Sequence, residues 1–189
     1  MRKEYRNVIR SKKMIRGAFL DLLGEKKRIE TITVSELAER ADIAKSTFYN
    51  HYADVYAVAE EFEDELIANL SDAMDGFEQD IEGERKEYFC KVIAFLEENE
   101  QVYRRVIACE DVLYVIEKLK LLISQKMFED RMPLPLSSDK KRRYVQIRFL
   151  TNACVDTIVD YFKGRLDITM SELKDILLFM LDRVAEPDC

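Results

Sequence analysis

Apolar residues recur at spacings of three and four residues along nearly the whole sequence, which is the period of an amphipathic α-helix. Strands would instead require an alternation of apolar and polar residues between turn-forming segments. The 189 residues include five glycines and three prolines, so few positions break a helix. The sequence therefore predicts an all-α fold of about nine helices and argues against a β-sandwich, a collagen-like chain or a disordered one.

The first part of the chain has the pattern of a helix-turn-helix. A long helix is predicted over 8–23, with Gly24 as its expected stop. Thr33 and Glu36 have the spacing of a capping box, which predicts that a short second helix begins there. A third short helix is predicted over 45–51. Two short helices joined by about four residues, after a longer one, are typical of DNA-binding helix-turn-helix units.

Helical periodicity continues to the end of the chain. A serine cap is expected after the Pro-containing break near residue 135, and Gly164 is expected to end the helix that follows. Thr169 and Glu172 have the spacing of a second capping box. The later helices are predicted over 55–74, 84–98, 101–109, 112–128, 139–163 and about 171–185.

Charge is distributed unevenly between the two parts of the chain. The net charge of the whole sequence is −7. Residues 1–54 carry 12 Lys and Arg against 8 Asp and Glu, whereas residues 55–189 carry 18 against 29. Seven basic residues lie within the first 16 positions, with Glu4 as the one acid among them. A basic arm of this kind suits a polyanion, although a basic run taken alone also fits a solvated helix face.

The segment 33–54 reads TVSELAERADIAKSTFYNHYAD. This segment resembles the helix-turn-helix of the TetR family of transcriptional regulators, with most typed positions of the family pattern in one register. The resemblance is specific over about 8–60 and architectural beyond, and it implies a DNA-binding domain at 1–54 and a helical regulatory and dimerisation domain at 55–189. The matching positions are Ala38, Ala41, Ile43, Ala44, Lys45, Ser46, Thr47, Phe48, Tyr49, His51, Tyr52 and Asp54.

The third predicted helix has one polar and one apolar edge. Phe48 and Tyr52 are four residues apart and are expected to hold the helix down. On the other edge, lysine favours guanine and asparagine favours adenine in the major groove. Tyrosine, histidine and the N-terminus of the second helix suit backbone phosphates. The residues expected at the DNA are Thr33, Lys45, Ser46, Thr47, Tyr49, Asn50 and His51.

Two positions depart from the family pattern. Asp42 occupies the position where the family often has glycine, so the turn must accommodate a side chain, which Asp tolerates better than most residues. Val55 occupies the position of the family's usual lysine, so one expected phosphate contact is absent. We hypothesise that Arg2, Lys3 and Arg6 of the basic arm compensate, in which case removing residues 1–6 weakens DNA binding and reduces its salt dependence.

The last two predicted helices are the candidates for a dimer interface. The helix at 139–163 carries two apolar stripes and therefore has to be covered from two sides, while the helix at 171–185 is strongly apolar. The resemblance implies a four-helix bundle made by these helices in a homodimer, which would place two DNA-binding units on a palindromic operator. The alternative is that the second stripe contacts another helix of the same subunit.

The resemblance also implies a small-molecule pocket in the helices between about 55 and 130, and repression relieved by a small effector. An activator that responds to a protein partner, as in relatives resembling the activators of dihydroxyacetone kinase operons, is the alternative. Aromatic and methionine residues at helical spacing are also ordinary core residues. The candidate pocket residues are Tyr88, Phe89, Phe95, Tyr103, Tyr114, Met127 and Phe128.

Other functional classes have little support in the sequence. His51 is the one histidine and lies in the helix-turn-helix, so the chain lacks a Ser/His/acid set, and it has neither a phosphate-binding glycine loop nor a metal-ligand spacing. The acidic run at 60–65 is expected to be a solvated face, and three of the four cysteines are expected to be reduced core thiols, with Cys189 exposed. No catalytic residue, cofactor, metal or membrane span is predicted, and a cytoplasmic location is expected. An all-α enzyme or small-molecule carrier, and an adaptor that binds only protein, remain the alternatives.

Overall fold

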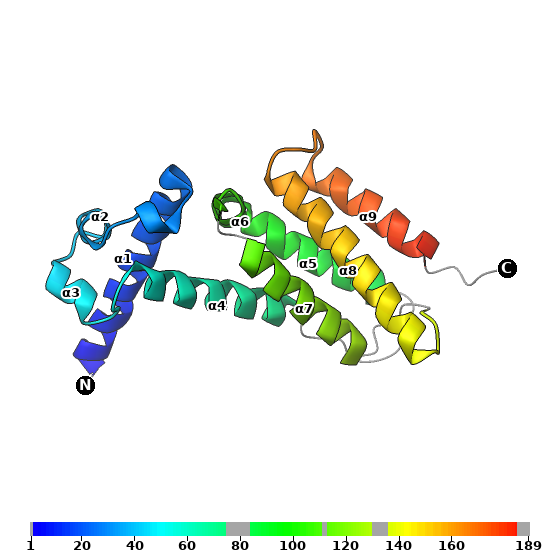
Figure 1. The fold of residues 1–189 in the computed structure, drawn as a ribbon, viewed down its shortest axis with the longest axis horizontal. Coiled ribbons are helices and arrows are strands. Elements are labelled where there is room, and N and C mark those ends of the chain that lie inside the picture. Colours follow the sequence, from blue (N-terminus) through cyan, green and yellow to red (C-terminus); the bar gives the residue numbers. More distant parts are fainter. Residues whose placement is uncertain (1, 75–83, 111–112, 130–135, 185–189) are drawn as a thin grey trace. The chain divides into compact units, whose positions relative to one another are not determined.

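The computed structural model describes residues 2–74, 84–110, 113–129 and 136–184. Within these residues the fold is all-α, with nine α-helices and one short 3₁₀ helix, as predicted (Figure 1). The chain divides into two compact units, one made of residues 1–67 and 101–113 and the other of residues 68–100 and 114–189. The helices are α1 (Arg2–Lys26), α2 (Val34–Arg40), α3 (Lys45–Tyr49), α4 (Val55–Met74), α5 (Glu84–Glu98), α6 (Glu100–Ile107), α7 (Leu113–Glu129), α8 (Lys140–Phe162) and α9 (Met170–Val184), with the 3₁₀ helix at Ile29–Thr31.

The first unit contains the predicted helix-turn-helix, packed on α1. Its largest fully buried side chains come from α1, α2, α3 and α4, so all four helices share one core. The boundary predicted at residue 54, between a DNA-binding and a regulatory domain, stays a prediction. These buried side chains are Ile15, Phe19, Leu37, Phe48 and Val58.

Helix α1 is longer than the sequence pattern predicts at both ends. It starts at Arg2, so the basic arm belongs to the helix. It also continues through Gly24 to Lys26, and the prediction of a stop at Gly24 is wrong. The end comes instead at Lys27, whose φ of 61° is left-handed and whose amide donates to the carbonyl of Leu23 (2.8 Å).

The turn between α2 and α3 has the predicted chemistry. The side chain of Thr33 accepts from the amide of Glu36, and the Glu36 carboxylate accepts from the amide of Thr33, so the capping box is complete. Asp42 adopts a φ of 52°, the left-handed conformation that glycine usually supplies at this point. The amide of Ile43 then donates to the carbonyl of Ala38 (3.0 Å), which closes the turn before α3.

Helix α4 is joined to α1 by ion pairs. Lys12 donates to Glu61 over 2.7 Å, and Arg16 pairs with Glu65 one turn further along. Tyr52 donates to the other oxygen of Glu61 (3.2 Å), so this one carboxylate joins α1, the end of the helix-turn-helix and α4. Glu61 and Glu65 of the acidic run thus pair with α1 while their side chains stay 36% and 41% exposed.

Helix α6 belongs to the first unit although it follows α5 in the chain. Arg105 donates to Asp21 of α1 (2.6 Å), and its side chain passes over Gly24, where a Cβ would lie 3.2 Å from the Arg105 Cγ. The amide of Glu110 donates to the carbonyl of Lys27 (2.9 Å). The segment after α5 is thus attached to the C-terminal end of α1.

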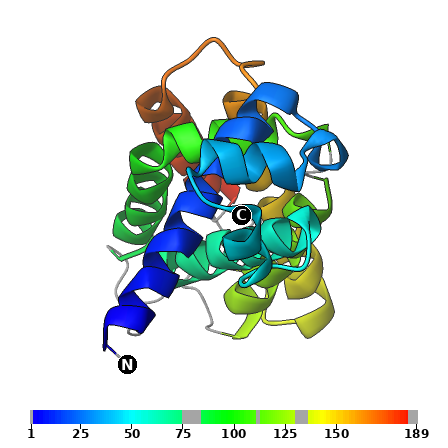
Figure 2. The same cartoon turned by 90° about the vertical axis from the view of Figure 1, so that its left-hand side faces the viewer.

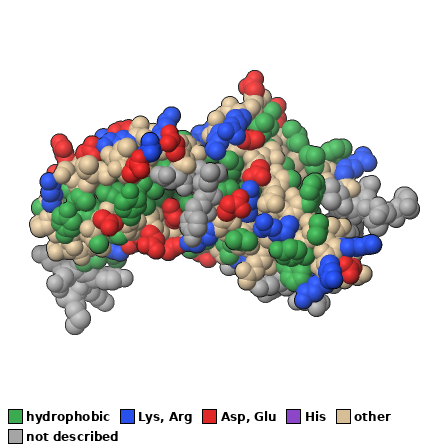
Figure 3. Space-filling view, in the orientation of Figure 1, with side chains coloured by type: hydrophobic (Ala, Val, Ile, Leu, Met, Phe, Trp, Pro, Cys, Tyr) green, Lys and Arg blue, Asp and Glu red, His purple; other side chains and the backbone are tan. Residues whose placement is uncertain are grey.

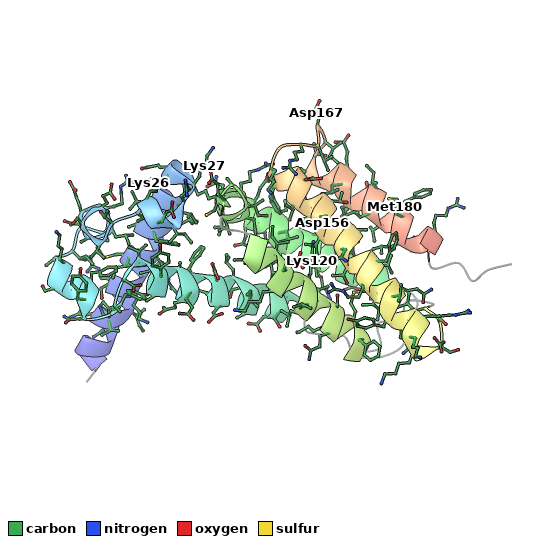
Figure 4. The ribbon with its side chains drawn as sticks, viewed as in Figure 1. Lys26, Lys27, Lys120, Asp156, Asp167 and Met180 are labelled. Atoms are coloured by element: carbon green, nitrogen blue, oxygen red, sulfur yellow. The ribbon has the colours of Figure 1, made fainter. Side chains whose placement is uncertain are left out.

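The second unit contains α5, α7, α8 and α9. Ile93, Ile147 and Leu173 are its largest fully buried side chains. Lys120 of α7 is buried and donates to Asp156 of α8 (2.6 Å), as Figure 4 shows. Although burial opposes its charge, Asp156 and Glu117 raise the pKa of Lys120 above its ordinary value.

The ends of α8 and α9 follow the predicted signals with one exception. Asp139, and not a serine, caps α8 by accepting from the amide of Arg142 (2.8 Å). Gly164 ends α8 with a φ of 68°. Thr169 and Glu172 form the second capping box before α9, with the amide of Thr169 donating to Glu172 (2.8 Å).

Candidate nucleic-acid interface

Helix α3 presents a polar surface, and buried aromatic side chains on its opposite side fix its position. Phe48 is fully buried and Tyr52 is 5% exposed, so both fix α3 against the rest of the first unit. Tyr49 is 59% exposed, and its ring meets Phe48 edge-on at 5.6 Å between centroids. Thr47 is half-buried, and the remaining outward side chains of the predicted site are Lys45, Ser46 and Asn50.

The side chain of His51 is oriented by a contact that the sequence pattern does not reveal. Its Nε2 lies 2.7 Å from the hydroxyl of Ser11 on α1. The Ser11 hydroxyl also donates to the carbonyl of Asn7 (2.8 Å), and which partner donates in its contact with His51 depends on the tautomer of the ring. Ser11 is therefore a positioning residue for His51, and 40 residues of sequence separate the two.

Thr33 is already engaged by the capping box. Its hydroxyl donates to Glu36 Oε2 (2.8 Å), its amide donates to the same oxygen (3.0 Å), and Lys26 donates to the other oxygen of Glu36 (2.6 Å). Hydrogen bonds from Lys26 and then from Thr33 lower the pKa of Glu36 to about 2. A phosphate at the start of α2 would thus meet the amides of Val34 and Ser35 rather than the Thr33 hydroxyl.

The start of α4 explains the departure at position 55. Val55 is 7% exposed, so it belongs to the core of the first unit and not to its surface. Asp54 caps the helix by accepting from the amide of Ala57 (2.9 Å). Tyr56, which the sequence analysis did not select, is 60% exposed in the first turn. Tyr56 could have been found in the sequence as an aromatic residue that interrupts the apolar periodicity directly after the helix-turn-helix motif.

The candidate pocket residues do not all lie in one compact unit. Tyr103 belongs to the first unit, where it is buried and where desolvation raises its pKa to about 12. In the second unit, Phe128 packs edge-on against Tyr144 (6.5 Å) and Met127 accepts a hydrogen bond from Thr151 (3.4 Å). Phe89 and Phe95 are half-buried on α5 in the same unit, and the side chains of Tyr88 and Tyr114 lie outside the described residues.

In the described residues the cysteines are thiols and no cluster of metal ligands forms. Cys90, Cys109 and Cys154 form no disulfide bond, and burial raises the pKa of Cys154 to about 11, which keeps this thiol protonated. Cys189 lies outside the described residues. In the described ranges, no three His, Cys, Asp or Glu side chains gather where they could hold a metal ion. No helix among them has the length and apolar character needed to cross a membrane.

Helices α8 and α9 expose a row of large apolar side chains, which Figure 3 shows on the surface of the second unit. On α8, Val145 and Phe149 are each 65% exposed, although the other half of the same stripe, Val159 and Phe162, is buried. An exposed aromatic and aliphatic surface of this kind marks a contact with another molecule. We name it the α8–α9 apolar surface: Tyr144, Val145, Phe149, Ile176, Phe179 and Met180, the last of which is labelled in Figure 4.

Comparison with solved structures defines the class of fold. The chain has the fold of the TetR-family transcriptional regulators, as the sequence predicts. A TetR-family regulator from Streptomyces coelicolor has a TM-score of 0.66 at 14% identity, covering 90% of this chain and 78% of that one. A TetR regulator from Streptococcus agalactiae 2603V has a TM-score of 0.59 at 20% identity, covering 94% of this chain and 97% of that one. These neighbours are regulators of transcription.

Two further similarities concern particular proteins. The dihydroxyacetone kinase operon activator DhaS has a TM-score of 0.65 at 16% identity, covering 93% of this chain and 96% of that one. A stretch of 49 residues is 41% identical to YxbF of Bacillus subtilis (strain 168), an uncharacterized HTH-type transcriptional regulator, and this match spans 26% of the chain and 13% of that relative. No family model matches the chain.

Proposed function

We propose that this protein is a TetR-type transcriptional regulator that binds a specific DNA sequence through α3. The main support for the proposal is the exposed polar edge of α3, which the buried Phe48 and Tyr52 fix in position. A short helix with one anchored and one polar edge fits the major groove, where donors and acceptors distinguish the base pairs. The similarity of a 49-residue stretch to an HTH-type regulator supports the same conclusion.

The residues expected at the DNA fall into two groups, those whose side chains suit base edges and those whose side chains suit phosphates. Lys45 and Asn50 are the candidates for reading base edges, with Ser46 and Thr47 beside them. Tyr49 and His51 can donate to phosphates, which positions the protein without reading the sequence. Tyr56, at the exposed start of α4, is a further candidate for a phosphate contact.

Specific binding requires two copies of the α3 surface. One helix-turn-helix offers a small contact, whereas two of them on a two-fold axis address a palindrome with half-sites about 34–36 Å apart or multiples of this distance. The α8–α9 apolar surface supports a homodimer through residues about 139–163 and 171–185, because covering these side chains removes them from water.

We propose repression relieved by a small effector as the mode of regulation, with activation through a protein partner as the alternative. The structural similarity to DhaS, which is named as an activator, keeps the alternative open. A reporter gene placed behind the selected operator distinguishes the two, because deletion of the regulator raises expression in the first case and lowers it in the second.

Substitution of α3 tests the proposal. Lys45→Ala and Tyr49→Ala each remove one exposed side chain, and we expect a loss of binding to the selected operator corresponding to ~1–3 kcal/mol for each residue, with unchanged thermal melting. Lys91→Ala, at an exposed lysine of α5, is the matched control and should bind as the wild type does. If both α3 variants bind the operator as tightly as the control, the protein-only adaptor or the all-α carrier becomes the better account.

A further inference from the structure

The helix-turn-helix segment carries little of the positive charge that DNA binding requires. Residues 33–54 include two basic residues, Arg40 and Lys45, against four acidic ones. Both terminal nitrogens of Arg40 donate to the carboxylate of Glu25, over 2.8 and 3.1 Å, so Lys45 is the cation that α3 and its turn can offer. Neutralisation of several phosphates supplies most of the non-specific affinity of DNA-binding proteins. That charge must therefore come from another element.

Helix α1 holds this charge on the side away from its packed face. Two of its seven N-terminal cations, Lys12 and Arg16, pair with α4. At 100° per residue, Arg6, Arg10 and Lys13 fall within ~60° of one another and nearly opposite the buried Ile15 and Phe19. All three are exposed, and the helix itself continues back to Arg2. We name these three residues the α1 basic stripe: Arg6, Arg10 and Lys13.

The stripe begins beside the end of the α3 segment. The contact between Ser11 and His51 places the third turn of α1 next to His51, two residues after the end of α3. From Ser11 the helix continues back to Arg2, which at 1.5 Å per residue is ~14 Å. Figures 1 and 2 both show this end of α1 extending past α3 and the start of α4 within the first unit.

We propose that the N-terminal half of α1, from Arg2 to Lys13, is a basic helix that runs along the DNA backbone next to the half-site that α3 reads. On one strand the phosphates follow one another every 3.4 Å measured along the duplex axis, so ~14 Å of helix reaches more than one of them. The contact is sequence-independent, because arginine and lysine bind phosphate oxygens there and not base edges. This inference rests on the proposed function, since it needs the DNA that α3 selects.

The variant Arg10→Gln/Lys13→Gln tests the stripe without touching the core of the first unit. We expect weaker binding to the operator and to random duplex by a similar factor, because phosphate contacts carry no sequence information. Each lost phosphate contact makes the slope of log binding constant against log salt concentration less steep by ~0.9. Losing two contacts in each of two subunits therefore makes it less steep by up to ~3.6. The matched control Lys91→Gln/Lys118→Gln removes the same charge from exposed positions of α5 and α7, outside the proposed DNA and dimer contacts.

The outcomes separate this inference from the proposed function. A reduced salt slope in the α1 variant, with the control and the thermal melting unchanged, supports the stripe. If the wild type selects an operator and the α1 variant keeps the same slope and affinity, or if the control loses as much, the stripe is a solvated face and the inference fails while the function stands. A wild-type protein that binds no DNA overturns both.

Discussion

Glu36 connects three parts of the first unit through one carboxylate. It accepts from the amide and hydroxyl of Thr33 at the start of α2 and from Lys26 at the end of α1, where Figure 4 labels Lys26. These hydrogen bonds stabilise the charged form, which is why the pKa of Glu36 falls to about 2. The side chain thus holds α2, on which α3 depends for its position, against α1.

The lowered pKa makes a prediction about acid stability. A carboxylate with a pKa of about 2 in the folded protein and an ordinary value of 4.5 contributes stability that is complete above pH about 4.5 and is lost as the pH falls toward 2. Glu36→Gln should therefore make the unfolding free energy less dependent on pH in this range. Glu39→Gln, at an exposed position of the same helix, is the control. Denaturant unfolding at several pH values gives the unfolding free energy of each variant. If this free energy changes equally steeply with pH in both variants, the role of Glu36 is contradicted.

Residue by residue, the local features of the site could be predicted and the distant ones could not. The capping box depends on two residues that are three positions apart, so its spacing is visible in the sequence. The same holds for the strained turn at Asp42, where the family pattern has glycine. The contact of Ser11 with His51 depends on how α1 packs against α3, and no local pattern contains that information.

At the scale of the element, α1 is a continuous helix of 25 residues with two glycines inside it. Its helical period was predictable because one face is apolar. Its C-terminal end was not, since a lysine in a left-handed conformation ends it, and a hydrogen bond from Glu110 holds that residue in place. The sequence pattern predicted that the helix ends at Gly24, but tertiary contacts keep this residue inside the helix.

The two glycines of α1 lead to a prediction about stability. A Cβ at Gly17 would meet no heavy atom within 4 Å, so Gly17→Ala should raise the unfolding free energy by ~0.5–1 kcal/mol through backbone entropy alone. At Gly24 the new Cβ would lie 3.2 Å from Arg105, whose side chain would have to move, and its pair with Asp21 would be disturbed. Gly24→Ala should therefore gain less than Gly17→Ala. Thermal or denaturant unfolding compares them, and a destabilising Gly17→Ala would count against the account.

At the scale of the whole molecule, the order of the helices and the all-α class followed from periodicity, but the composition of the units did not. Residues 101–113 join the first unit because Arg105 and Glu110 contact the end of α1, and these contacts link residues more than 80 positions apart. Of the α8–α9 apolar surface, Val145 and Phe149 were predictable as part of a second apolar stripe on α8, because the period of a single helix defines that stripe.

The apolar surface predicts how the protein assembles. Phe149→Glu and Phe179→Glu each place a charge among exposed apolar side chains, and burial of an unpaired charge in an interface is costly. We expect each variant to sediment as a monomer at concentrations where the wild type is a dimer, and to lose binding to the palindrome. Leu121→Glu, at a 59% exposed leucine of α7, is the matched control and should remain a dimer. A wild type that stays monomeric while it binds its operator would contradict this assembly.

The most direct measurement of the central claim is selection of the purified protein against a random duplex DNA library at near-physiological salt, where specific and non-specific binding can be separated. The account predicts enrichment of one palindrome whose half-sites are about one helical turn apart or a multiple of it. Lys45→Ala should reduce this enrichment, and Lys91→Ala should preserve it. Recovery of no preferred sequence by a folded, dimeric protein would contradict the account.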